Sequence, residues 1–152
     1  MSDEATDLTI VRSIGAPREA VWSAWTTPRE LACWWWPERF QTKYELDLRV
    51  DGMYRFRTSE VPGMGILDLT GRFESVQRPE LLAYTWHWAS SDEAESRVTV
   101  EFLDQGGRTE LRIHHAGFST PEERDNHVIG WNDCLDRLER YSGAEVNPPA
   151  PA

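Results

Sequence analysis

Histidines are the side chains of this sequence best suited to acid–base or metal chemistry, and three of them occupy informative positions. His114 and His115 are adjacent in a segment of alternating apolar and polar residues. Neighbouring residues of a strand point to opposite faces, so these two imidazoles cannot bind one metal ion together. His115 falls on the apolar side, either as a hydrogen-bonding group inside a cavity or as a satisfied histidine of the core or edge. His127 lies beside the apolar stripe of a later helix, and if both rings face one hollow they form its polar end.

Other signatures of catalysis are missing from the sequence. It contains no Gly-rich phosphate loop, no G-x-S-x-G elbow and no Cys–His signature. Cys33 and Cys134 stand in no metal or redox spacing, and we expect both to be buried free thiols. We therefore expect no catalytic residues, no metal and no cofactor, although an enzyme of the cyclase or hydratase kind stays open.

The charge balance limits the choice of partners. Sixteen Lys and Arg side chains against 26 Asp and Glu give a net charge of -10, which repels a nucleic-acid backbone. No apolar run approaches the ~18 residues of a membrane span. The first residues, MSDEATD, lack the basic and apolar regions of a secretion signal. We expect a cytoplasmic protein, monomeric or homodimeric, that binds no nucleic acid and has no membrane span.

Alternation of apolar and polar residues predicts a sheet. Residues 8–14 read as a half-buried strand, and a period of two dominates residues 41–116. Turn sequences at 51–52, 62–63, 78–80, 90–92 and 105–107 divide that region into six strands. Their short connections make the strands antiparallel. Arg12 falls on the apolar side of the first strand, so it either snorkels at the edge or enters a cavity as a cation. Alternatively, this strand is buried on both faces and Val11 belongs to the core.

Proline and capping sequences predict three helices, two short and one long. Pro17 begins the first helix, and Thr27-Pro-Arg-Glu30 is typical of a capping box that begins the second. The second helix ends near Pro37, because a proline disfavours helical geometry at the residue before it. Thr120-Pro-Glu-Glu123 is another capping box, followed by an unbroken helix up to Gly143 with an apolar stripe at Val128, Trp131, Leu135 and Leu138.

Together these elements predict an α+β domain over residues 8–142, with residues 1–7 and the proline-rich residues 143–152 disordered. A curved antiparallel sheet of six to seven strands holds the long C-terminal helix, and two short helices follow the first strand. One helix is ~10 Å across, whereas six or seven strands at ~4.8 Å spacing span about three times that width. The sheet must therefore curl, which favours a hollow between sheet and helix.

Aromatic residues supply the expected lining of that hollow. Eight tryptophans offer more apolar surface than folding alone requires. We expect Trp22 and Trp25 to be core residues. The run Trp34-Trp35-Trp36 cannot all point inward from one helical turn, so at least one ring is exposed or marks a mouth. The candidate ligand-binding residues are Trp35, Phe40, Tyr54, Phe56, Leu69, Trp86, Trp88, His115, Phe118, His127, Trp131 and Leu135.

Four segments, read together, resemble one protein family. They are Ala16–Trp22 with Trp25, Thr26 and Pro28; Trp34–Pro37; Gly65–Pro79 leading into Leu82–Trp86; and Gly130-Trp131 with Leu135 and Leu138. As a set they are similar to bacterial members of the family named after the activator of the heat-shock-protein-90 ATPase, within the START-like (SRPBCC, helix-grip) superfamily. The resemblance runs over residues 8–141. Trp36 stands where the family usually has a glycine, and Asp51-Gly52 where it has a double glycine.

The resemblance implies a helix-grip fold with a cavity for apolar or amphipathic small molecules, and no shared catalytic residues. It also implies, in eukaryotic relatives, a chaperone-activating role. Our leading hypothesis is binding of an apolar or aromatic small molecule, lipid-like or polyketide-like, for sequestration, transport or sensing. One alternative is a partner of a chaperone ATPase that acts through an exposed apolar patch such as the Trp36 region. The other is a cyclase- or hydratase-type enzyme.

Overall fold

The computed structural model describes residues 6–89 and 94–146. Of the expected disordered ends, residues 1–5 and 147–152 lie outside the described residues, whereas Asp7 belongs to a strand and residues 143–146 to a helix. Seven strands and four helical segments follow one another along the described part of the chain. In order they are β1 (Asp7–Ile14), α1 (Arg18–Thr26), α2 (Pro28–Trp34), the short 3-10 helix η1 (Glu38–Phe40), β2 (Lys43–Leu46), β3 (Met53–Arg57), β4 (Asp68–Gln77), β5 (Leu81–Trp88), β6 (Ser96–Asp104), β7 (Thr109–Ala116) and α3 (Pro121–Val146).

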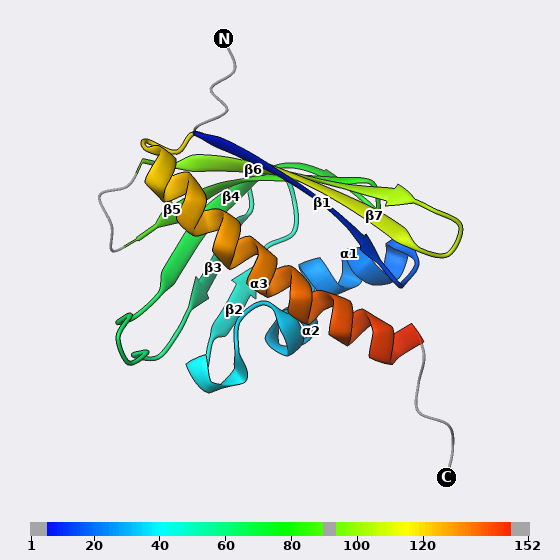
Figure 1. Ribbon diagram of the computed structural model, residues 1–152, viewed down its shortest axis with the longest axis horizontal. Coiled ribbons are helices and arrows are strands. Elements are labelled where there is room, and N and C mark those ends of the chain that lie inside the picture. The colour runs from blue at the N-terminus through cyan, green and yellow to red at the C-terminus, as the bar shows by residue number, and fades with distance from the viewer. Residues whose placement is uncertain (1–5, 90–93, 147–152) are drawn as a thin grey trace.

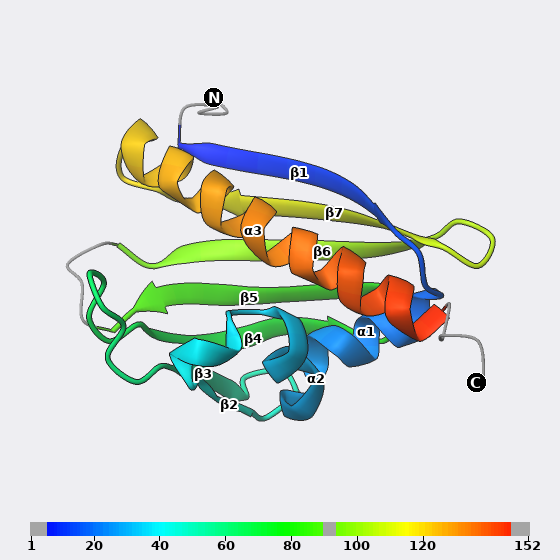
Figure 2. The same cartoon turned by 60° about the horizontal axis from the view of Figure 1, so that its bottom comes forward.

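The described strands form one antiparallel sheet in the order β1-β7-β6-β5-β4-β3-β2. Neighbours in the sheet are neighbours in sequence except at β1, which pairs with the last strand, β7. Figure 2 shows α3 crossing the face of this curved sheet obliquely, with α1 and α2 closing one end. The predicted α+β helix-grip architecture is therefore confirmed, including its two short helices after the first strand.

A bulge in β4 contributes to the curvature of the sheet. The pairing of β4 with β5 shifts register between Phe73 and Ser75, and such a bulge bends a strand and increases its twist. Gly71 brings two strands closer still, since a Cβ at this position would lie 2.0 Å from the Thr85 carbonyl oxygen. The Tyr54 hydroxyl occupies that space and donates to the same oxygen at 2.5 Å. The absence of a side chain at residue 71 therefore lets the Tyr54 ring of β3 pack against β4 and β5.

The long helix α3 begins as the sequence predicts. The Glu123 N–H donates to the Thr120 hydroxyl at 3.1 Å, which is the N-cap bond of the predicted capping box. Trp131, Leu135 and Leu138 are buried against the sheet, and Figure 1 shows the helix lying along its concave face. The helix continues past Gly143, where we expected it to end, to Val146.

The capping box predicted at Thr27–Glu30 does not form. In a capping box the Glu30 carboxylate would accept a hydrogen bond from the Thr27 N–H. Here that N–H already donates to the Ser23 carbonyl at 3.0 Å, because Thr27 also ends α1. The Glu30 carboxylate instead accepts from the Ser23 hydroxyl and, at 2.8 Å, from the Tyr141 hydroxyl of α3. Glu30 therefore joins α2 to α3 rather than capping its own helix.

The carboxyl end of α2 is bonded directly to α3. The Arg137 guanidinium donates to the carbonyl oxygens of Trp34 and Trp35 at 2.8 and 2.6 Å. The Cys134 thiol donates to the Trp35 carbonyl at 2.9 Å. These bonds satisfy acceptors that a helix end otherwise leaves unpaired. Cys134 is buried as expected, but Cys33 is exposed, contrary to our expectation, because it lies on the outer face of α2.

Arg12 does not enter a cavity. Its guanidinium leaves β1 and reaches the polar side of α3, where it bonds Asn132 at 3.2 Å and Asp136 at 2.9 Å and lies 3.2 Å from Glu139. Asp136 and Glu139 are largely exposed. Of the alternatives considered for Arg12, the structure has the one at the edge of the sheet. The strand is not buried on both faces, because Val11 is 55% exposed.

Replacing Arg137 should cost more stability than replacing Arg12, although both side chains contact α3. Arg137→Met leaves the Trp34 carbonyl without its donor, and we expect the free energy of unfolding to fall by about 2–3 kcal/mol. Arg12→Met removes contacts to exposed carboxylates and should cost less than about 1 kcal/mol. Urea unfolding of both variants measures the difference. Equal losses would show that the α2–α3 bonds are not a principal stabilising contact.

Candidate functional site

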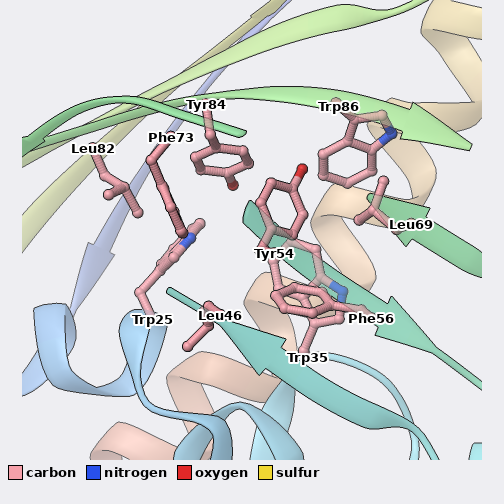
Figure 3. Close-up of a pocket in the computed structure, with 10 residues that line it drawn as sticks. All are labelled: Trp25, Trp35, Leu46, Tyr54, Phe56, Leu69, Phe73, Leu82, Tyr84 and Trp86. Carbon is pink, nitrogen blue, oxygen red and sulfur yellow. The ribbon is translucent and has the colours of Figure 1, made fainter. Parts of the chain in front are cut away.

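The hollow predicted between sheet and helix is filled by side chains. Its remaining volume is about 10 Å³, which is room for one water molecule at most. Figure 3 shows side chains from α1, the end of α2 and the sheet converging on this space, which we call the central hollow. Its lining consists of Trp25, Trp35, Leu46, Tyr54, Phe56, Leu69, Phe73, Leu82, Tyr84 and Trp86. The predicted site residues Tyr54, Phe56 and Leu69 therefore pack against other rings here instead of facing open space.

Open space lies instead at one edge of the hollow, beside the first half of α3. This cavity, the edge pocket, has a volume of about 250 Å³. Its lining consists of Trp35, Trp36, Met64, Leu67, Trp86, Trp88, Asn126, His127, Gly130, Trp131 and Cys134. Five of these were among the predicted ligand-binding residues, namely Trp35, Trp86, Trp88, His127 and Trp131.

Trp36 forms one wall of the edge pocket. Its ring stacks on that of Trp88 with centroids 6.1 Å apart and planes 17° apart. The backbone N–H of Trp36 donates to the Tyr44 hydroxyl at 3.2 Å. Trp34 and Trp35 are buried while Trp36 is half-buried, as expected for a run that cannot all point inward. A glycine at residue 36, as is usual in the resembled family, would leave this wall without a ring.

Two histidines lie next to the pocket, and each accepts a hydrogen bond from a tryptophan. The Trp131 indole N–H donates to His115 Nδ1 at 3.0 Å, so His115 Nε2 carries the proton and donates to Ser96 Oγ at 2.7 Å. The Trp88 indole N–H donates to His127 Nε2 at 3.0 Å, and His127 Nδ1 donates to the Glu123 carbonyl at 2.7 Å. Both rings are therefore neutral in this arrangement.

The two imidazoles lie close together but do not face one hollow, because only His127 reaches the edge pocket. Their ring centroids are 5.5 Å apart, and the Phe118 ring lies 4.4 Å from His115 and 4.6 Å from His127. His115 is fully buried behind Trp131 and lines neither cavity. Phe40, Phe118 and Leu135 are likewise buried outside both linings.

Several lining residues were missed by the sequence reasoning, which followed the buried stripe of α3 only. Asn126, Gly130 and Cys134 are spaced by four and so share a neighbouring face of the helix, a signal that was available in the sequence. Met64 and Leu67 come from the loop between β3 and β4. No sequence pattern places that loop beside α3, because the contact depends on the curvature of the sheet.

Ionisable groups beside the pocket are held in their neutral forms. Burial lowers the pKa of His115 well below its usual 6.5, and the nearby His127 and His114 act in the same direction. Burial raises the pKa of the Cys134 thiol to about 12. The described residues contain no group of three or more His, Cys, Asp or Glu side chains that could hold a metal ion. The arrangement is suited to holding an uncharged molecule.

Stability should fall as the pH decreases below 6.5. In that range the unfolded chain binds a proton that folded His115 does not, so the free energy of unfolding decreases by up to about 1.4 kcal/mol per pH unit. Between about pH 7 and pH 5 we expect a loss of about 1–2 kcal/mol in urea unfolding.

The matched variants for this effect lie side by side on β7. His115→Gln should flatten the pH dependence, whereas His114→Gln, on the opposite face, should retain it. An NMR titration of the His115 Hε1 resonance tests the same point without any substitution. A His115 ring that takes up its proton near pH 6.5 in the folded protein would contradict the prediction.

Comparison with known proteins places the chain among others of the same architecture. Residues 15–143 match the sequence model of the family described as "Activator of Hsp90 ATPase homolog 1-like protein". A search of curated protein sequences finds no significant match. Within the described residues, no helix combines the length and apolar character of a membrane span.

Solved structures of similar fold come from several organisms. A Chromobacterium violaceum protein is 23% identical, with 90% of this chain and 96% of that chain covered and a TM-score of 0.76. A Rhodobacter sphaeroides protein is 24% identical, with coverages of 93% and 94% and a TM-score of 0.74. An HSP90 activator of Plasmodium falciparum is 22% identical, with coverages of 91% and 96% and a TM-score of 0.67. These likenesses establish a shared fold, and the sequence match establishes that the chain belongs to the family of Activator of Hsp90 ATPase homolog 1-like proteins.

Proposed function

We propose that this chain binds a small apolar molecule of one or two rings in the edge pocket. The observation that carries the proposal is the cavity itself, about 250 Å³ enclosed mainly by aromatic side chains. A dry apolar cavity of about 150 Å³ holds benzene, whereas pockets for drug-sized ligands run to about 300–1,000 Å³. The available volume therefore suits a ligand somewhat larger than benzene.

The mouth of the pocket combines rigid and adaptable walls. The stacked rings of Trp36 and Trp88 present a flat apolar surface on one side. Met64 is 58% exposed, and its unbranched side chain can adjust to ligands of different shape. Such a mouth favours planar molecules, because they gain contact with the rings without further ordering of the protein.

The filled central hollow narrows our original hypothesis of a lipid-like or polyketide-like ligand. Trp35 and Trp86 separate the edge pocket from the hollow and line both. An extended acyl chain would have to displace rings that are packed against one another, such as Trp35 on Phe56 at 5.6 Å between centroids. A compact ligand is therefore the better fit for sequestration, transport or sensing.

Action on a chaperone ATPase is the second candidate function. The related Plasmodium falciparum structure is that of an HSP90 activator, and the family carries the same activity in its description. In this chain Met64 and Ile66 are 58% and 43% exposed on the loop beside the pocket. A protein partner that covered this loop would remove apolar surface from water.

A cyclase or hydratase activity receives less support. A general base needs a lone pair that can reach the substrate. Among the described residues around the pocket, the lone pairs of His115 and His127 are both occupied by indole N–H groups. We therefore do not extend the proposal to this class of enzyme.

Titration of tryptophan fluorescence separates the two candidate functions. Saturable quenching by one- and two-ring compounds is expected for the wild-type protein, because four tryptophans besides Trp131 line the edge pocket. The parallel assay measures the ATPase rate of a heat-shock-protein-90 chaperone with and without this chain. A stimulated ATPase without any quenching would reject the small-molecule proposal in favour of the chaperone.

Two substitutions at Gly130 provide a blocked pocket and its control. A Cβ at Gly130 would meet open space, so a side chain fits the helix here. Gly130→Ala should raise the free energy of unfolding by about 0.5–1 kcal/mol and preserve binding. Gly130→Leu should weaken binding at least about tenfold, since the loss of most pocket contacts exceeds 1.4 kcal/mol. Undiminished binding to the folded Gly130→Leu variant would show that the ligand lies elsewhere.

A further inference from the structure

Two indole N–H groups at the edge pocket have no acceptor among the described residues. They belong to Trp35 and Trp86, whose side chains are only 2% and 6% exposed. Both residues line the pocket. An unpaired buried donor costs about 1–3 kcal/mol, and here two such donors belong to neighbouring rings whose centroids are 6.1 Å apart.

Neighbouring tryptophans do have acceptors, which makes this pair distinctive. Trp34 donates to the Ala24 carbonyl at 2.9 Å, Trp88 to His127 and Trp131 to His115, each at 3.0 Å. Figure 3 shows the Trp86 nitrogen on the side of its ring turned away from Tyr84. Among the described residues, the buried indole N–H groups without an acceptor therefore belong to the two rings that separate the central hollow from the pocket.

Charge around the pocket decides which kind of acceptor fits. Its lining contains no Lys or Arg, and His127 is neutral in its hydrogen-bonded form. A buried carboxylate without a cation is strongly disfavoured, whereas a neutral carbonyl needs only hydrogen-bond donors. The net charge of -10 adds long-range repulsion of anions.

We propose that the ligand of the edge pocket is an uncharged carbonyl compound whose oxygen accepts from at least one of the Trp35 and Trp86 indole N–H groups. This inference rests on the proposed function and specifies its ligand class. The carbonyl oxygen has two lone pairs, so it can accept from one of these donors or from both. The aromatic walls hold the rest of the molecule, while the two indoles select a ketone, ester or lactone over a hydrocarbon of the same shape.

Three probes with one bicyclic skeleton test the acceptor: tetralin, 1-tetralone and the larger, charged 1,2,3,4-tetrahydro-1-naphthoate. Calorimetric titration of the wild-type protein should give a Kd for 1-tetralone at least about fivefold lower than that for tetralin, with the carboxylate weakest. In ¹H–¹⁵N spectra, 1-tetralone should shift the indole N–H resonance of Trp35, of Trp86 or of both downfield. Tryptophan-to-phenylalanine variants assign these resonances.

Substitutions that keep a ring but remove the N–H locate the donor. The preference for 1-tetralone over tetralin should fall toward one in Trp35→Phe, in Trp86→Phe or in both. Trp88→Phe is the matched control, because Trp88 lines the same pocket but its N–H is bonded to His127. The preference should survive there. Because the readout is a ratio of two ligands on one protein, a general loss of affinity does not mimic the result.

The failures of the two proposals are distinguishable. If neither tetralin nor 1-tetralone binds, the proposed small-molecule function falls and this inference falls with it. If both bind equally and neither indole resonance moves, the ligand-binding function stands and the carbonyl inference is overturned. Tightest binding by the carboxylate would likewise overturn it.

Discussion

The junction between α2 and α3 is the interaction on which the rest of this structure depends. Three donors on α3 hold the last two carbonyl groups of α2, two from the Arg137 guanidinium and one from the Cys134 thiol. Because the chain turns immediately after these carbonyls, the junction fixes the direction in which Trp35 leaves the helix. The Trp35 ring then contacts Trp25, Phe56, Trp86 and Trp131, so one short hydrogen-bonded junction orients the middle of the core.

Aromatic rings determine where this fold is open and where it is closed. A curved sheet that holds a single helix leaves more width than the helix can cover. Here the surplus is occupied by rings from both layers, such as Tyr54 on Phe73 and Trp25 on Trp131. Among the described residues, the edge pocket remains open where α3 carries Gly130 instead of a side chain and where the loop contributes Met64 and Leu67 to the lining. The pocket is thus a local consequence of side-chain size.

Membership of the family accounts for the architecture, whereas the side chains that line the pocket depend on the sequence of this chain. The similar structures share 22–24% of their residues with it and superpose over nearly their whole length. Trp36, whose ring stacks on Trp88, replaces the usual glycine of the family. The Trp36 ring therefore presents a wall here that a glycine cannot provide, and the unpaired indole N–H groups of Trp35 and Trp86 lie beside it.

The amino-acid sequence by itself determined the order and type of the strands and of the helices α1, α2 and α3, but it did not indicate the short 3-10 helix η1. Alternation in β6 and β7 and the capping residues Thr120–Glu123 are local patterns, and the structure confirms them. The fold of the sheet around the long helix followed from the same patterns with the family resemblance. Thr27–Glu30 misled because one residue serves two helices, and its N–H can donate only once. Local patterns fail where two elements compete for the same backbone group.

Only the tertiary structure decided which of the predicted aromatic residues face open space. Tyr54, Phe56 and Trp88 all occupy alternating positions on strands, yet the first two fill the central hollow and the third lines the edge pocket. Their fates differ because the volume left between sheet and helix depends on the bulge in β4, on the path of the loop with Met64 and on the tilt of α3. Each of these three features depends on many contacts between residues that are distant in sequence. Periodicity assigns a side chain to a face, but the packing of all its neighbours decides whether that face is filled.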